Sequence, residues 1–110
     1  MAETFKANHV ALTTSNQDIV PAVAASTQTI ALTIRATNVD GTNNATVDVQ
    51  VVDTGGSPTA YIAKSMTVPA GGSIEIAGNS KIVLETGDKI QALASDSGDV
   101  EVFVSYLEIT

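Results

Sequence analysis

The last third of the chain, Lys81–Thr110, reads KIVLETGDKIQALASDSGDVEVFVSYLEIT. It contains three short apolar runs separated by two clusters of turn-forming residues, Thr86–Asp88 and Ser95–Asp99. Gly, Asp and Ser in such clusters favour chain reversal, and the runs between them have the length and the β-branched content of strands. The stretch therefore predicts a small all-β module in which the last residues of the chain belong to the sheet.

The same alternation of strand and turn is present upstream. Thr29–Thr37 and Ala45–Val51 each alternate apolar and polar side chains, which is the period of a half-buried strand. Asn38–Asn44 lies between them and is rich in Asn, Asp and Gly, so the two runs are predicted to pair as a hairpin. Four side chains of the first run are expected to share its buried face: Ile30, Leu32, Ile34 and Ala36.

Further turns are predicted at Asp53–Pro58 and Pro69–Gly72, on either side of a strand-like run at Thr59–Val68. Lys64 interrupts the apolar face of this run, so either its charged end snorkels to solvent or the run lies near a sheet edge. Pro21 cannot donate to a hydrogen-bond ladder, so the extended piece around it is also expected at an edge. The apolar face of the run is expected to consist of Ala60, Ile62, Met66 and Val68.

These turns recur about every ten residues, and no window longer than a turn or two has the apolar spacing and caps of a helix. The pattern predicts one antiparallel β-sandwich of about eight strands, jelly-roll-like, with an immunoglobulin-like sandwich as the alternative. At 110 residues and 4% aromatic content, the chain is expected to form a single domain, residues 1–110, around an aliphatic core. Residues 1–8 are expected either as a flexible arm, anchored on a neighbour by Phe5, or as a frayed terminus.

Composition excludes several classes of partner. The formal net charge is −7 with only five Lys plus Arg, which argues against nucleic-acid binding because phosphate backbones require clustered cations. No apolar run approaches the roughly 20 residues that span a bilayer, and the first residues lack the features of a signal peptide. We therefore expect no membrane partner and synthesis in the cytoplasm, unless the protein leaves as part of a larger particle.

The sequence predicts no catalytic, cofactor-binding or metal-binding residues, and no cofactor. His9 is the only histidine and the chain has no cysteine, so multi-histidine and thiolate sites are excluded. The acids of the later turns, Asp88, Asp96 and Asp99, lack the spacing of a calcium-binding loop and are typical turn residues. The glycine pair Gly71–Gly72 precedes no predicted helix and is not a phosphate-binding loop. The protein is therefore not expected to be an enzyme.

The final strand is apolar on both faces. One face carries Val100, Val102, Val104 and Tyr106, and the opposite face carries Phe103, Leu107 and Ile109. Either the strand is central and its second face is covered by the N-terminal segment, for example by Phe5, or that face is a subunit interface. Both alternatives stay open at this stage. The candidate interface residues are Phe5, Phe103, Leu107 and Ile109.

Three segments together resemble small virion structural proteins of tailed bacteriophages: TVPAGGSIEI (67–76), KIVLETGDKI (81–90) and VFVSYLEI (102–109). In those proteins an LxxGDxI hairpin is followed by a terminal VSYLEI strand. The resemblance implies a capsid decoration (cement) protein of the virion, made in the host cytoplasm. Such a protein binds the major capsid protein, stabilises the phage head and self-associates as a trimer or dimer.

The same resemblance also admits a neck or tail-fibre accessory module that binds a receptor or glycan. That alternative requires a groove lined by Tyr61 or Tyr106 with turn carboxylates nearby. The family carries no catalytic residues that could be transferred to this chain.

Overall fold

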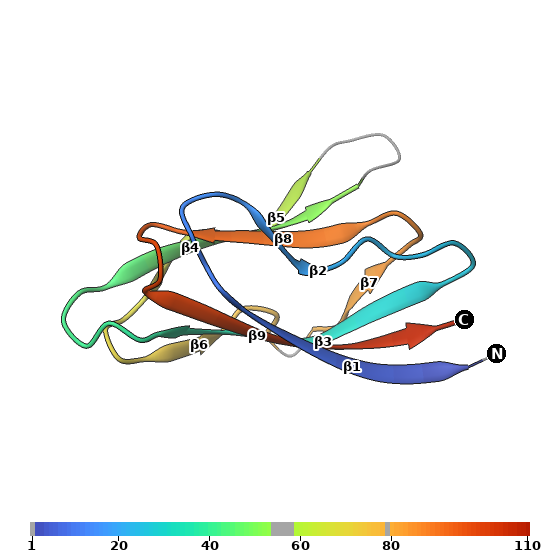
Figure 1. The fold of residues 1–110 in the computed structure, drawn as a ribbon, viewed down its shortest axis with the longest axis horizontal. Helices are drawn as coiled ribbons and strands as arrows, with labels where there is room; N and C mark the ends of the chain where they lie inside the picture. The colour runs from blue at the N-terminus through green and yellow to red at the C-terminus, as the bar shows by residue number, and fades with distance from the viewer. Residues whose placement is uncertain (1, 54–58, 79) are drawn as a thin grey trace.

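The computed structural model describes residues 2–53, 59–78 and 80–110, which form an all-β sandwich (Figure 1). Its strands are β1 (Glu3–Ala11), β2 (Gln17–Val20), β3 (Gln28–Asn38), β4 (Ala45–Val52), β5 (Ala60–Val68), β6 (Ser73–Glu75), β7 (Ile82–Leu84), β8 (Lys89–Ala94) and β9 (Val100–Ile109). Sheet 1 has the order β1-β9-β3-β6, with β7 also paired to β3, and sheet 2 has the order β2-β8-β4-β5. Among these residues no helix is long and apolar enough to cross a membrane.

The strand order is that of a jelly roll. β6 and β7 are three residues each and pair with different parts of β3, so they occupy one strand position and leave eight positions in total. The first four strands alternate between the two sheets, as in the double Greek key of a jelly roll. In an immunoglobulin-type sandwich the first two strands share a sheet. The predicted jelly-roll-like sandwich of about eight strands is therefore confirmed, and the immunoglobulin-like alternative does not apply.

The predicted hairpin between Thr29–Thr37 and Ala45–Val51 is wrong. β3 belongs to sheet 1, whereas β4 belongs to sheet 2 and pairs with β5 and β8. The connection is held by Asn38, which is buried and donates from Nδ2 to the carbonyl of Asn43 (2.9 Å) and to the carbonyl of Val68 in sheet 2 (3.0 Å). Turn-forming residues thus reverse the chain at the predicted place, but the reversal carries it across the sandwich.

A bulge in β3 divides the face that was expected to be continuous. Ala31 lies opposite Tyr106 and Thr33 lies opposite Ser105, so Leu32 is an extra residue on β3. One inserted residue exchanges the two faces of a strand. Ile34 and Ala36 are therefore buried as predicted, but Ile30 is placed on the outer face, and Ala31 is buried in its stead.

The edges of sheet 2 agree with the sequence. β2, which ends just before Pro21, and β5, which contains Lys64, are the two outer strands of this sheet. The predicted apolar face of β5 is only partly correct, because two register shifts and a positive φ of 51° at Ser65 bury Ala63 and leave Met66 and Ala60 exposed. The turn predicted at Asp53–Pro58 lies, from residue 54 on, outside the described residues.

The core lies between the sheets and is aliphatic, as predicted. Its largest fully buried side chains include Leu12, Ile19, Ile34, Leu84 and Ile90. Tyr106 is the one aromatic side chain among the described core residues, while Phe5, Tyr61 and Phe103 are exposed. The inner face of β9, made by Val100, Val102, Val104 and Tyr106, is buried throughout, which confirms that part of the prediction.

Candidate functional site

The outer face of sheet 1 carries all four candidate interface residues. Phe5 is 75% exposed and Phe103 is 47% exposed, while Leu107 and Ile109 are half-buried. β1 pairs with β9 along its whole length, with Phe5 opposite Leu107, and therefore lies beside β9 in the sheet. The N-terminal segment, for which an arm or a frayed end was expected, therefore contributes residues 3–8 to β1 and extends the sheet instead of covering it.

An apolar row crosses this face from one strand to the next. Phe5 on β1 lies opposite Leu107 on β9, Leu107 opposite Ile30 on β3, and Ile30 opposite Val83 on β7. Val83 is 64% exposed and Ile30 is half-buried. These four side chains, Phe5, Leu107, Ile30 and Val83, are called the apolar row below.

Sequence reasoning missed two members of the apolar row. Ile30 was assigned to the inner face because nothing in the sequence marks the bulge at Leu32. Val83 could have been found from the period of two, since Leu84 beside it is a fully buried core residue and successive side chains of a strand point to opposite faces.

Phe103 lies in a second, more polar row on the same face. His9 lies opposite Phe103 on β1, Arg35 lies opposite it on β3, and Glu75 lies opposite Arg35 on β6. Glu75 accepts a hydrogen bond from the backbone N–H of Ile34 (2.8 Å), and Arg35 Nη1 donates to Ser73 Oγ (3.1 Å). Phe103 is thus an exposed ring flanked by hydrogen-bonding groups, which is the composition of an interface with both apolar and polar contacts.

The outer face of sheet 2 is different in character. Gln50 on β4 donates to Gln91 on β8 (3.5 Å), and Gln91 donates to Asp18 on β2 (2.8 Å). Lys89 forms an ion pair with the same aspartate (3.5 Å), and on β5 Lys64 pairs with Asp48 (3.1 Å). The hydrogen bond from Lys64 to Asp48, together with the negative charge of that carboxylate, raises the pKa of Lys64. This face therefore carries a polar network suited to solvent, whereas the apolar row is on sheet 1.

One ion pair links β1 to β9. Lys6 Nζ lies 2.8 Å from Glu108 Oε1, and this hydrogen bond, together with the negative charge of Glu108, raises the pKa of Lys6. The side chain of Asn8 also donates to the carbonyl of Ile19 on β2 (3.0 Å). Both contacts hold β1 against the sandwich and so keep Phe5 and His9 in a defined position.

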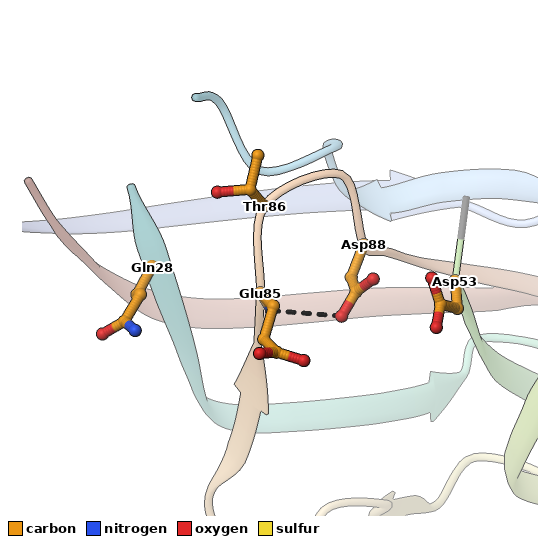
Figure 2. Close-up of a pocket in the computed structure, with 5 residues that line it drawn as sticks. All are labelled: Gln28, Asp53, Glu85, Thr86 and Asp88. Atoms are coloured by element: carbon orange, nitrogen blue, oxygen red, sulfur yellow. Dashed lines mark hydrogen bonds between the residues drawn. The ribbon is translucent and has the colours of Figure 1, made fainter. Parts of the chain in front are cut away.

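A hollow of about 400 Å³ next to the end of β7 is lined by Gln28, Asp53, Glu85, Thr86 and Asp88 (Figure 2). Asp88 Oδ2 accepts from the N–H of Glu85 (3.1 Å), and the Asp88 N–H donates to the Glu85 carbonyl (3.0 Å), so this carboxylate closes its own turn. In the described part of the chain no three His, Cys, Asp or Glu side chains are grouped so that they could hold a metal ion.

The tyrosines do not line this hollow. Tyr106 is 6% exposed and belongs to the core. Tyr61 is exposed on β5, with Lys64 Nζ 4.7 Å from the centre of its ring. The described residues therefore do not combine a tyrosine with the acids of the turns.

No family model matches the chain, and no curated protein matches its sequence. Among solved structures, the chain is similar to a protein of Bacillus endospore appendages, a family of disulfide-linked pili, with 13% identity, a TM-score of 0.56, and 99% of this chain and 87% of that chain covered. It is also similar to the Drosophila NLP core, studied for pentamer formation and histone binding, with 16% identity, a TM-score of 0.54, and 99% and 98% covered. A pentameric capsid protein from metagenomic phage sequences has 16% identity and a TM-score of 0.46, with 93% and 59% covered.

At these identities the similarities show the fold alone. Disulfide links of the kind that join the endospore pili are not available to this chain, because it contains no cysteine. Any assembly that it forms must depend on side-chain packing, hydrogen bonds and charge.

Proposed function

We propose that this chain is a non-enzymatic structural protein of a virion, and specifically a capsid decoration protein that binds the major capsid protein and stabilises the phage head. The observation that carries the proposal is the apolar row, which crosses β1, β9, β3 and β7 on a face that the rest of the described chain leaves open. Contiguous exposed apolar side chains on a soluble protein mark contact surfaces. The resemblance of residues 67–109 to tailed-phage virion proteins supports the same role.

The geometry suits a stiff module that adds contact area between neighbouring subunits. Phe5, Phe103 and Val83 project from paired strands, so little conformational entropy is lost when they are buried. Burial yields about 25 cal/mol per Å² of apolar surface. A modest contact at each site is then repeated by the symmetry of the shell. Two proteins of similar fold build a pilus and a pentamer, which is consistent with self-association in general, and the dimer or trimer is our proposal.

The alternative, a neck or tail-fibre module that binds a receptor or glycan, has less support. It needs a groove lined by a tyrosine with turn carboxylates nearby, but Tyr106 is in the core and the ring of Tyr61 is next to Lys64. Copy number in purified particles separates the two roles: decoration requires on the order of hundreds of copies, and a neck or tail position about a dozen or fewer.

Two valines provide a matched test of the surface. Val83 (64% exposed) belongs to the apolar row, and Val39 (52% exposed) lies in the loop between the sheets, away from it. We expect Val83→Ser to weaken binding to capsids of a phage mutant lacking this protein by about tenfold or more, which corresponds to about 1.4 kcal/mol. Val39→Ser should bind as the wild type does. Equal binding by both variants, with both folded, would remove the apolar row from the capsid contact.

A further inference from the structure

The edge strands of this sandwich are not equally protected against pairing with another chain. β2 has four residues and a register shift and is followed by Pro21, and β5 has two register shifts and Ser65 at positive φ. β6 and β7 are three residues each. Short strands, bulges and proline are the features by which natural sheets discourage edge-to-edge association. The remaining edge, β1, pairs with β9 from Glu3 to Ala11 without a register shift and contains no proline or glycine.

The hydrogen bonds at the ends of β1 determine which backbone groups face the free edge. Ala2 and Thr110 exchange two bonds (3.1 and 2.9 Å), and the Leu12 N–H donates to the Val100 carbonyl (2.8 Å). Even-numbered residues of β1 therefore bond to β9. In an antiparallel ladder the alternate residues direct their N–H and C=O to the other side. On β1 these are five exposed residues: Glu3, Phe5, Ala7, His9 and Ala11.

We propose that β1 pairs antiparallel with β1 of a second copy of this chain, about a two-fold axis at Ala7. This register overlaps the whole of Glu3–Ala11 and uses the backbone groups that β9 leaves free. It places Glu3 opposite Ala11, Phe5 opposite His9 and Lys6 opposite Asn8, so no like charges meet across the axis.

Neighbouring registers are less favourable. A shift of two residues in either direction shortens the overlap, and in one direction it also places Lys6 opposite Lys6 across the axis. Like charges directly opposite each other destabilise paired strands. A shift of one strand by an odd number of residues is excluded, because it would place the outward-facing side chains of one copy opposite the inward-facing side chains of the other.

The pairing joins the outer faces of the two copies. His9 lies beside Phe103 within one chain. In the dimer Phe5 of the second copy would lie on the other side of His9, so the apolar row of one copy would continue into the Phe103 row of the other.

The dimer contact itself needs no capsid, and its test uses the free protein. It can therefore fail while the proposed capsid contact stands, and the reverse also holds.

Single cysteines test the register, because the natural chain has none. In the proposed dimer the two copies of residue 7 are a hydrogen-bonded pair about 5.5 Å apart between Cα atoms. Residue 11 pairs with residue 3, so its two copies are eight residues apart along the strand, or about 27 Å. Ala7→Cys should form a covalent dimer with a short bismaleimide under native conditions, and Ala11→Cys should not. The proposal is overturned if neither variant forms a crosslink, or if Ala11→Cys crosslinks as fast as Ala7→Cys. If Phe5→Cys or His9→Cys crosslinks faster than Ala7→Cys, the two-fold axis does not lie at Ala7.

A second variant tests the backbone directly. Ala7→Pro removes an N–H that β9 does not use, and it should weaken dimerisation about tenfold or more in sedimentation velocity. Ala7→Thr keeps the N–H and should dimerise as the wild type does. Far-UV circular dichroism establishes that both variants are folded. A wild-type chain that remains monomeric at high concentration, or an unchanged dimer of a folded Ala7→Pro variant, contradicts the proposal.

Discussion

The side chain of Asn38 connects the two sheets, and its removal is a quantitative test of the jelly-roll connection. Asn38 is 1% exposed at the end of β3. Its Nδ2 donates to the carbonyls of Asn43 (2.9 Å) and Val68 (3.0 Å), and its Oδ1 accepts from the N–H of Asp40 (2.9 Å). Substitution of Asn38 by alanine would leave these three backbone groups without their partner.

The three bonds differ in burial, which sets the expected cost. The bond to Val68 is buried, and a buried carbonyl without a partner costs about 1–3 kcal/mol. The bonds to Asn43 and Asp40 are partly buried, so water replaces part of each and about 0.5–1 kcal/mol is lost per bond. Asn38→Ala should therefore lower the free energy of unfolding by about 2–5 kcal/mol, a large part of the roughly 5–15 kcal/mol of a typical domain.

Denaturant unfolding at one fixed protein concentration measures this loss, because self-association would otherwise add to stability. Asn43→Ala is the matched control: its side chain is exposed and makes one weak bond, to Asp40 Oδ2 at 3.5 Å. The control should change stability by about 0.5 kcal/mol or less. If Asn38→Ala costs less than about 1 kcal/mol, or no more than the control, then the amide does not hold the connection between the sheets.

Two further predictions concern loops and edges. Ser65→Val should destabilise the fold by about 1–2 kcal/mol, because a β-branched residue is poorly accommodated at a φ of 51°. The control Thr67→Val, on the same strand, should not destabilise it. Equal thermal unfolding midpoints for the two variants would contradict this prediction. The backbone N–H of Thr42 lowers the pKa of Asp40 from its usual 3.8. Its carboxylate therefore stabilises the folded loop above that value, and the contribution is lost as the pH falls through the lowered folded pKa. Stability should accordingly depend less on pH between about 6 and 2 in Asp40→Asn than in the wild type, and identical profiles would contradict the assignment.

Local pattern was sufficient for the fold class and for most of the inner face of the sandwich. The alternation of Val100, Val102, Val104 and Tyr106 identified the buried side of β9, and the turn residues placed most chain reversals correctly. Both signals act over a few residues, and both are physical requirements of a half-buried strand or a tight turn.

The pairing of strands could not be obtained in the same way. Asn38–Asn44 has the composition of a hairpin turn, yet the amide of Asn38 reaches the carbonyl of Val68, thirty residues away, and directs the chain into the other sheet. The bulge at Leu32 is likewise stabilised from a distance, since Glu75 on β6 accepts from the N–H of Ile34 (2.8 Å). Long-range contacts of this kind leave no local pattern, which is why Ile30 was assigned to the wrong face.

The candidate site was predicted in part for the same reasons. Phe103, Leu107 and Ile109 followed from the alternation of one strand. The alignment of Leu107 with Phe5, Ile30 and Val83 depends on the registers of three strand pairs that are distant in sequence. Register is determined by the assembled sheet, so a row across strands is visible only in the fold.

The asymmetry between the two sheets is the strongest argument that sheet 1 faces a partner. If the apolar row were only the incidental exposure common to protein surfaces, apolar side chains should be equally frequent on the outer face of sheet 2. There, the exposed large apolar side chains of the described residues, Tyr61 and Met66, are confined to the edge strand β5. On β2, β8 and β4, Gln50, Gln91, Asp18 and Lys89 form a connected polar network, and the edge strands β2 and β5 are irregular. The apolar face and the long regular edge therefore occur on the same sheet, so a single orientation of the molecule would present both to an assembly and leave the polar face in solvent.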